Sequence, residues 1–401
     1  METETVTIAH NNLNAAIKAV AGFMPRRTQK PILRNLRLRA TAGSSFTASG
    51  LEVYATDLET SAVITLGDID GETIATTLVP ADTAAAIGKA REAVSIVPND
   101  TTIETLGARV PVDDPLEYPS PPDSLDAGYA AWLPFAFVRA ADDAVACATD
   151  NESSRYALGG ILLERIDGDR LVRAVGTDGR RLHAITVDDG GADKGPLSAI
   201  VHPHAIRLFR RAVQVMAAAI VGKAGKAAAA YCDGASVGVR VNGDDVEFSW
   251  TGAGCRVRVV TRTIQGRFPR WRDVFPAEVF EPSPVMIPMP AGREQIVAAA
   301  RCASEMSKGV QFDGATLSAR SSNRGEYSAP FVGTMPDGVK IKLDPAYLVE
   351  MIDGAAAVTD CKAVPMFVRD YSSGAAVKVN GGIDPHDGIG FAAILMPLAA
   401  D

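Results

Sequence analysis

Cysteine is scarce in this chain and never occurs in a C-x-x-C pair. The 401 residues contain five cysteines, which lie far apart: Cys147, Cys232, Cys255, Cys302 and Cys361. An odd and scattered set of thiols excludes a disulfide framework and a cysteine-based zinc site, and it is typical of reduced thiols. The first ten residues, METETVTIAH, are acidic and lack the apolar stretch of a signal peptide. We therefore expect a cytoplasmic protein.

Long hydrophobic runs and an excess of positive charge are also missing. The most apolar window, AVQVMAAAIVGKAGKAAAAYC, is interrupted by Gln214, Lys223 and Lys226, too soon for a membrane span. The net charge is −8, which excludes a protein that coats nucleic acid indiscriminately, although basic residues can still gather on one surface. The 47% hydrophobic and 22% charged residues are ordinary for a globular protein, and the length suggests two to three domains.

Three different signals recur about once in each third of the chain. A proline opens a short apolar helix after a strand at Pro80, Pro203 and Pro345. A strand enters a polar turn and leaves it as another strand in LEVYATDLETSAVITL, RLVRAVGTDGRRLHAITV and ATLSARSSNRGEYSAPFV. Hairpins are predicted in VGVRVNGDDVEFSW, with Asn242-Gly243 at its turn, and in AAVKVNGGID, with Asn380-Gly381.

Each third also begins with a predicted amphipathic helix, at residues 11–24, 135–148 and 293–306. Proline-rich segments at 113–128 and 275–292 separate the repeats and are typical of linkers. The chain therefore predicts an α+β protein of three tandem copies of one unit, at 1–125, 129–278 and 279–401.

Basic residues recur on the predicted helices. Three similar domains in a row favour a curved or closed array with an inner and an outer face, so these side chains would share one face and hold a polyanion by its backbone. They are Lys18, Arg26, Arg27, Lys89, Arg91, Arg139, Arg207, Arg210, Arg211, Arg293, Arg301 and Lys308. The alternative is that each is simply a solvated helix residue.

Several stretches, in the same order along the whole chain, resemble the bacterial DNA polymerase III β subunit, the sliding-clamp family. They are RTQKPILRNLRLRA, ASGLEVYATDLETSA, SSRYALGGILLE, LVRAVGTDGRRLHAI, TIQGRFPRWRDVFP and FAAILMPLAAD. The resemblance implies three clamp domains per chain, with helices lining the inner face and antiparallel sheets outside. It further implies a head-to-tail homodimeric ring that encircles duplex DNA, slides along it, tethers the replicative polymerase and needs no cofactor.

The resemblance also implies a cleft between the second and third domains that binds short linear peptides of the polymerase, the clamp loader and repair proteins. Carried over position by position, the cleft residues are Leu158, Thr177, Gly179, Arg180, Arg181, Leu182, Pro269, Val274, Ile394, Leu395, Met396, Pro397 and Leu398. Gly179 allows close backbone approach, Leu182, Val274 and Met396 offer an apolar pocket, and Arg181 can extend over its rim. The alternative is that the apolar members are core residues.

The expected DNA contacts are Arg27, Arg155, Tyr156, Arg207, Arg210 and Arg211. The chain departs from the family at Ala157, where a second aromatic is frequent, and at Ala399 and Ala400, where a basic residue and a leucine are usual. Ser304 and Glu305 replace aliphatic residues at the expected subunit interface. A clamp-like scaffold that binds peptides without closing a ring is therefore the second hypothesis.

Three motifs suggest catalysis or metal binding, and each has a structural alternative. In the turn VGTDGRRLHAITV, Asp178 is expected to organise the turn and His183 to lie on the strand that leaves it. GASVG, at 234–238, matches a nucleophile elbow, but a hairpin follows it instead of a helix, so Ser236 is read as a strand entry. HPH, at 202–204, lacks further metal ligands and is read as a helix start. VGKAGKAAAA lacks the spacing of a phosphate-binding loop.

Overall fold

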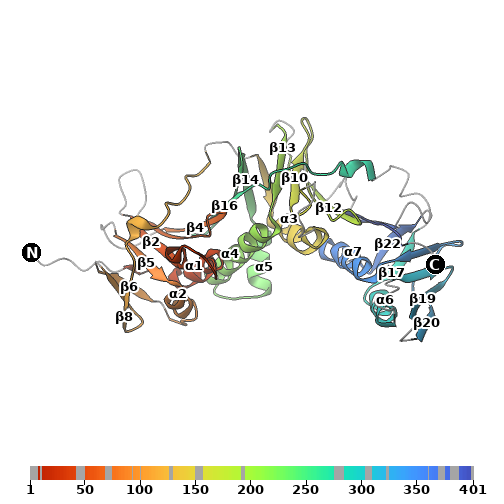
Figure 1. The fold of residues 1–401 in the computed structure, drawn as a ribbon, viewed down its shortest axis with the longest axis horizontal. Helices are drawn as coiled ribbons and strands as arrows, with labels where there is room; N and C mark the ends of the chain where they lie inside the picture. Colours follow the sequence, from red (N-terminus) through yellow and green to blue (C-terminus); the bar gives the residue numbers. More distant parts are fainter. Residues whose placement is uncertain are drawn as a thin grey trace, which may run out of the picture. The chain divides into compact units, whose positions relative to one another are not determined.

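Figure 1 shows the fold of the chain, a computed structural model. The structure describes residues 8–9, 11–41, 50–67, 75–92, 94–99, 101–125, 130–149, 157–190, 195–274, 284–302, 309–321, 325–359, 361–368, 375–379 and 388–398. These residues pack as two compact units, Met1–Ala136 with His204–Thr263, and Phe137–Pro203 with Ile264–Asp401.

The first unit contains one eight-stranded and one four-stranded antiparallel sheet. The larger sheet has the order β5 (Ala75–Pro80), β2 (Asn35–Thr41), β3 (Gly50–Thr56), β4 (Thr60–Gly67), β16 (Cys255–Arg262), β15 (Asp245–Gly252), β14 (Ser236–Asn242), β9 (Ala131–Pro134). The smaller sheet has the order β1 (Ile8–Ala9), β6 (Ser95–Pro98), β7 (Thr102–Thr105), β8 (Ala108–Pro111).

The second unit also contains one eight-stranded and one four-stranded antiparallel sheet. Its larger sheet has the order β13 (Leu197–Val201), β10 (Ile161–Arg165), β11 (Leu171–Thr177), β12 (Arg181–Asp188), β24 (Ile389–Leu395), β23 (Ala375–Val379), β22 (Ala363–Val368), β17 (Val285–Pro288). Its smaller sheet has the order β20 (Gly325–Pro330), β19 (Thr316–Ser321), β18 (Val310–Asp313), β21 (Lys340–Leu343).

The strand order reveals the repeat that the sequence predicts. The orders β5-β2-β3-β4, β13-β10-β11-β12 and β21-β18-β19-β20 follow one connection pattern, and β1-β6-β7-β8, β9-β14-β15-β16 and β17-β22-β23-β24 follow a second. Pairing of β4 with β16, and of β12 with β24, joins four-stranded sheets of neighbouring thirds into the eight-stranded ones. For this reason the two units do not follow the predicted domain boundaries, which remain a prediction.

The helices begin where the recurring signals predict them. Those in the described part of the chain are α1 (Leu13–Val20), α2 (Ala81–Ile87), α3 (Phe135–Ala140), α4 (Pro203–Val221), α5 (Lys226–Asp233), α6 (Ala291–Cys302) and α7 (Pro345–Val358). Pro80 is the N-cap of α2, and Pro203 and Pro345 are the first residues of α4 and α7. Leu13, Ala16, Ile17 and Val20 of α1 are fully buried, as the amphipathic pattern predicts.

The helix expected over 135–148 is not regular. After α3 the chain makes a π-helical turn at Ala141–Val145 and a 3-10 turn at Ala146–Ala148. This irregular end lies very close to β11: a Cβ added to Gly176 would lie 2.6 Å from the carbonyl oxygen of Val145. Only glycine lets the helix end and the strand come so near.

The hairpin of β14 and β15 forms as predicted, but its turn is shifted by one residue. Asn242 pairs with Asp245, so the central residues are Gly243, with a φ of 58°, and Asp244. Cross-strand pairing of Val239 with Phe248 sets this register. Ser236 is the first residue of β14, as expected of a strand entry. The turn Asn380-Gly381 lies outside the described residues.

The first proline-rich segment is more than a linker, because it is held on a sheet. The Tyr118 hydroxyl donates to the carbonyl of Asn35 at 2.8 Å, and the Tyr118 ring packs edge-on against Tyr54. Farther along, Ser124 Oγ and the Leu125 amide lie 3.3 and 3.2 Å from Glu247, a fully buried carboxylate. The segment therefore covers one face of the larger sheet of the first unit.

No single helix in the described residues is long and apolar enough to cross a membrane. Only α4 and α5 taken together have the length and apolar composition of a membrane-spanning helix, and they are bent by 112° at their junction.

Candidate functional site

The turn between β11 and β12 is built by its own side chains. Asp178 Oδ1 accepts hydrogen bonds from the amides of Arg180 and Arg181, at 2.9 and 3.0 Å. Thr177 Oγ1 donates to the carbonyl of Arg181 at 2.6 Å and accepts from the amide of Gly179 at 3.1 Å. Gly179 has a φ of +84°, which favours glycine. Asp178 therefore organises the turn, as the sequence predicts, and is not a catalytic acid.

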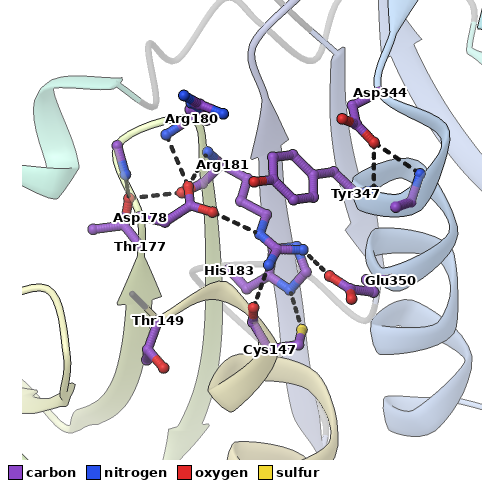
Figure 2. Close-up of polar contacts among 12 residues, drawn as sticks. Cys147, Thr149, Thr177, Asp178, Arg180, Arg181, His183, Asp344, Tyr347 and Glu350 are labelled. Carbon is purple, nitrogen blue, oxygen red and sulfur yellow. Dashed lines mark hydrogen bonds and ion pairs between the residues drawn. The ribbon is translucent and has the colours of Figure 1, made fainter. Parts of the chain in front are cut away.

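Arg181 links this turn to α7, which lies far away in the sequence. Its Nε donates to Asp178 Oδ2 at 3.1 Å, and its two terminal nitrogens donate to Glu350 and to the carbonyl of Cys147 (Figure 2). The guanidinium carbon lies 4.0 Å from the centre of the Tyr347 ring. The Arg181 side chain is only 8% exposed, so it does not extend over a rim as we expected from the sequence. The ion pairs with Asp178 and Glu350 offset the cost of burying its charge.

Tyr347 and Glu350 are site residues that the sequence analysis missed. Both lie on the first turns of α7, whose N-terminus is capped by Asp344: its carboxylate accepts from the amides of Ala346 and Tyr347. Their spacing of three residues places them on one face of the helix. No local signal shows that this face meets a turn about 170 residues earlier in the chain.

His183 is a core residue. It is fully buried, its Nδ1 donates to the carbonyl of Ala144 at 2.6 Å, and its ring packs edge-on against Phe391. Burial lowers the pKa of His183 to about 4, so the imidazole is neutral near pH 7. Cys147 Sγ lies 3.5 Å from His183 Nδ1, but burial raises the pKa of this thiol. The pair lacks the thiolate and the accessible base that nucleophilic catalysis needs.

The C-terminal segment lies directly beside the turn. β24 pairs with β12 so that Leu182 faces Ile394, and the Met396 amide donates to the carbonyl of Arg180 at 2.9 Å. Farther along, the Leu398 amide donates to the carbonyl of Lys342 at 2.8 Å. The turn and the tail, which the resemblance assigns to one cleft, are therefore neighbours in the structure.

A third segment, residues 264–274, packs on the same apolar cluster. Trp271 is buried against Leu182 and Ile394 in one core cluster. The indole N–H of Trp271 donates to Glu164 at 3.0 Å, and the Arg272 guanidinium lies over the ring. The Ala157 amide donates to the carbonyl of Arg267, which ties the start of the 157–163 segment to this run.

The thirteen expected cleft residues differ in exposure, which separates core from surface members. Leu158, Thr177, Arg181, Leu182, Ile394 and Leu395 are buried, Pro269, Pro397 and Leu398 are half-buried, and Gly179, Arg180, Val274 and Met396 are exposed. The exposed apolar side chains are Val274 and Met396, 46% and 47% exposed. These two are the apolar members of the set most open to a ligand.

The expected DNA-binding residues lie in part on α4. Arg207 and Arg211 are exposed and four residues apart, so they share one helix face, whereas Arg210 is half-buried. Arg27 is exposed beyond the end of α1. Arg155 and Tyr156 lie outside the described residues, as do Ser304 and Glu305. Arg293, which we expected on the same basic face, is paired with Asp353 at 2.6 Å on α7.

The HPH motif lies at the start of α4. In the described part of the chain, no three His, Cys, Asp or Glu side chains gather as metal ligands would. His202 and His204 are exposed and flank Pro203, the first residue of α4. The motif therefore marks a helix start, as predicted.

Comparison with known proteins gives a match by structure and none by sequence. No family profile and no curated protein sequence matches the chain. The DNA polymerase III subunit β of Pseudomonas aeruginosa is similar with a TM-score of 0.77 and 19% identity, over 98% of this chain and 99% of that one.

Two further clamps have comparable values. The β subunit of Thermotoga maritima has a TM-score of 0.76 and 17% identity over 99% and 100% of the two chains. The sliding clamp of Bacillus subtilis has a TM-score of 0.75 and 14% identity over 98% and 99%. The chain thus has the fold of the bacterial DNA polymerase III β subunit, the sliding clamp, along nearly its whole length.

Proposed function

We propose that this protein is a DNA polymerase processivity factor: two copies form a head-to-tail ring that encircles duplex DNA, slides along it and tethers the replicative polymerase. The observation that carries the proposal is the match to sliding clamps over nearly the full length of both chains. The protein itself makes or breaks no covalent bond. A separate loader supplies the ATP hydrolysis that opens the ring.

The free sheet edges support a ring. Inside the chain, β4 pairs with β16 and β12 pairs with β24. Each pairing joins the edge strand that ends the first spatial order, β4 or β12, to the edge strand that ends the second, β16 or β24. The last strands of the two remaining sheets are β8 and β20, which pair only with β7 and β19 among the described strands. Pairing of β8 in one copy with β20 in another would repeat the internal junction and cover both open edges.

The helices of the first unit support binding of the DNA backbone. Arg207 and Arg211 on α4 and Arg27 after α1 are exposed cations on an otherwise acidic protein. Guanidinium groups that contact phosphates without reading bases hold any sequence and permit sliding.

The turn at 177–182, the tail at 394–398 and the segment at 264–274 support a peptide-binding cleft. They meet around one apolar cluster and leave Val274 and Met396 exposed. An exposed methionine adapts to several apolar side chains, which suits a surface shared by the polymerase, the clamp loader and repair proteins.

Retention on DNA circles tests the proposal. The protein is loaded onto a nicked circular duplex with a bacterial clamp loader, and bound protein is measured before and after the circle is linearised. We expect loss on linearisation only, because a ring slides off free ends. Equal retention on both forms, removed by salt, would mean ordinary electrostatic binding. A monomer that binds peptides but is never retained would favour the scaffold hypothesis.

A further inference from the structure

The turn between β3 and β4, in the first unit, repeats the turn between β11 and β12 bond for bond. Thr56 Oγ1 donates to the carbonyl of Thr60 at 3.2 Å and accepts from the amide of Leu58 at 2.9 Å. Asp57 Oδ1 accepts from the amides two and three residues later, at 3.0 and 2.7 Å. The turn at 177–181 makes the same four bonds (Figure 2). The turn proposed to form one wall of the cleft therefore has a copy in the first unit.

The strand beside this turn is attached in the same way in both units. The Arg262 amide donates to the carbonyl of Glu59 at 3.1 Å, and the Met396 amide donates to the carbonyl of Arg180 at 2.9 Å. Arg262 therefore corresponds to Met396, and Glu59 corresponds to Arg180. Because a cation replaces an apolar residue and a carboxylate replaces a cation, the copy in the first unit is suited to a different ligand.

Leu58 occupies the position of Gly179 in the first-unit turn. Its φ is +79°, against +84° for Gly179, in the left-handed region that favours glycine. A leucine in this conformation is strained, and 42% of its surface stays exposed, so burial offsets little of the strain. Backbone strain of this kind is typical of ligand-binding positions. The turn thus presents an exposed apolar side chain in a conformation that leucine rarely adopts.

A pocket of about 220 Å³ opens beside Leu58, within the first unit. Its lining comes from the turn, from the adjoining ends of β3, β4, β15 and β16, and from Pro119, Ser120 and Pro122 of the first proline-rich segment. The Tyr54 hydroxyl donates to the carbonyl of Ser120 at 3.3 Å, which attaches that segment to the sheet. Small-molecule sites begin at roughly 300 Å³, so this pocket has room for one large side chain of a peptide.

The charges around the pocket favour a cation. The charged lining residues are Glu59, Asp245 and Arg262, of which Glu59 and Arg262 are exposed and Asp245 is half-buried. Two more carboxylates, Asp57 and Asp244, adjoin them in the chain. Threonine and serine hydroxyls, which can accept hydrogen bonds, complete the polar lining.

We propose that this pocket is a second peptide-docking site, which takes an arginine side chain of a linear peptide. The guanidinium offers five donors in a planar fork, which suits Glu59, Asp245 and the hydroxyl oxygens around them. The aliphatic stem of the arginine, and an apolar side chain next to it in the peptide, pack against Leu58 and the rings of Pro119 and Pro122. Neither ring closure nor occupation of the second-unit cleft is needed for this binding.

Fluorescence anisotropy of the full-length protein tests the site, with a fluorescein-labelled peptide in which one arginine is flanked by leucines. The matched peptide carries glutamate in place of arginine, and we expect it to bind at least about tenfold more weakly. Glu59→Gln should weaken binding of the arginine peptide about tenfold, because it removes a charge-assisted hydrogen bond. Glu104→Gln, at an exposed carboxylate of the same unit outside the pocket, controls for general attraction to an acidic protein.

Leu58→Gly separates binding from folding. Glycine relieves the backbone strain, so the thermal midpoint should stay close to that of the unsubstituted protein or rise. The arginine peptide should bind about five- to tenfold more weakly, because the apolar contact is lost. Leu106→Gly is the matched control, since Leu106 also has a positive φ, 51°, is 50% exposed, and lies in the turn between β7 and β8.

Equal affinity for the arginine and glutamate peptides, no saturable binding of either, or equal weakening in Leu58→Gly and Leu106→Gly would overturn the proposal. Met396→Asp checks the location of the peptide. We expect this variant to keep its affinity for the arginine peptide, and a loss would assign the peptide to the second-unit cleft instead. Retention on DNA circles is measured separately, so failure of the ring and failure of this site are distinguishable.

Discussion

The guanidinium carbon of Arg181 lies 4.0 Å from the centre of the Tyr347 ring, although the two residues come from the two separate chain segments of the second unit. Through this contact, and through Glu350, the turn that begins β12 is attached to the start of α7. The turn proposed to form one wall of the cleft is therefore held in place by a buried cation.

Replacing Arg181 tests this attachment. We expect Arg181→Ala to lower the free energy of unfolding by about 3 kcal/mol, because it removes the stacking and leaves the partner groups without their donor. Arg181→Lys should lose less, since it keeps the charge but not the planar fork. Urea unfolding measures the change. Arg180→Ala, at the exposed neighbouring position, is the control, and an equal loss there would contradict the assignment.

The buried histidine predicts a stability that depends on pH. The pKa of His183 is about 4 in the folded protein, below its ordinary value of 6.5, so the unfolded chain binds the proton more readily. The contribution of neutral His183 to the free energy of unfolding is fully present above about pH 6.5. It is lost as the pH falls towards 4, by about 3 kcal/mol over this window. Urea midpoints between pH 7.5 and 4.5 measure the slope. His183→Gln should remove the part of the pH dependence that His183 causes. An unchanged slope in this variant would rule out His183 as the cause.

Glu247 is expected to stabilise the fold of the first unit. It is fully buried, with nitrogens of Arg240, Arg256 and Arg258 at 3.2, 3.6 and 3.6 Å. Glu247→Ala should lower the free energy of unfolding by about 3 kcal/mol, because it leaves these cations without their shared counter-charge and frees the segment at Ser124. Glu104→Ala, in an exposed pair with Arg109, should change it by about 0.5 kcal/mol or less. Thermal unfolding of both variants provides the comparison.

The exposed methionine of the tail should matter for peptide binding. We expect Met396→Asp to raise the Kd of a fluorescent peptide carrying a glutamine and large apolar side chains by about tenfold, since a charge replaces an apolar contact. Val332→Asp is the control, because Val332 is also an exposed apolar residue of the second unit, 55% exposed. Fluorescence anisotropy measures both. If the two variants bind the peptide equally well, Met396 is not part of the cleft.

Much of the fold was predictable because its signals are local. The prolines at 80, 203 and 345, the alternation in β14 and β15, and the Asx-type turn at Asp178 all depend on residues within a few positions of one another. The irregular helix end at Ala141–Ala148 was not predictable from its local sequence, because it packs closely against Gly176 of β11, outside that stretch.

The sequence by itself determined the three-part repeat and the elements of each part, since hydrophobic period, turn residues and helix caps act over short distances. Only the tertiary structure decided that Arg181 is buried and that Tyr347 and Glu350 stand beside it. Partners of Arg181 are 34 and 169 residues away. Whether a charged side chain is exposed to solvent or paired in the interior depends on such distant neighbours, and these are set by the packing of sheets and helices.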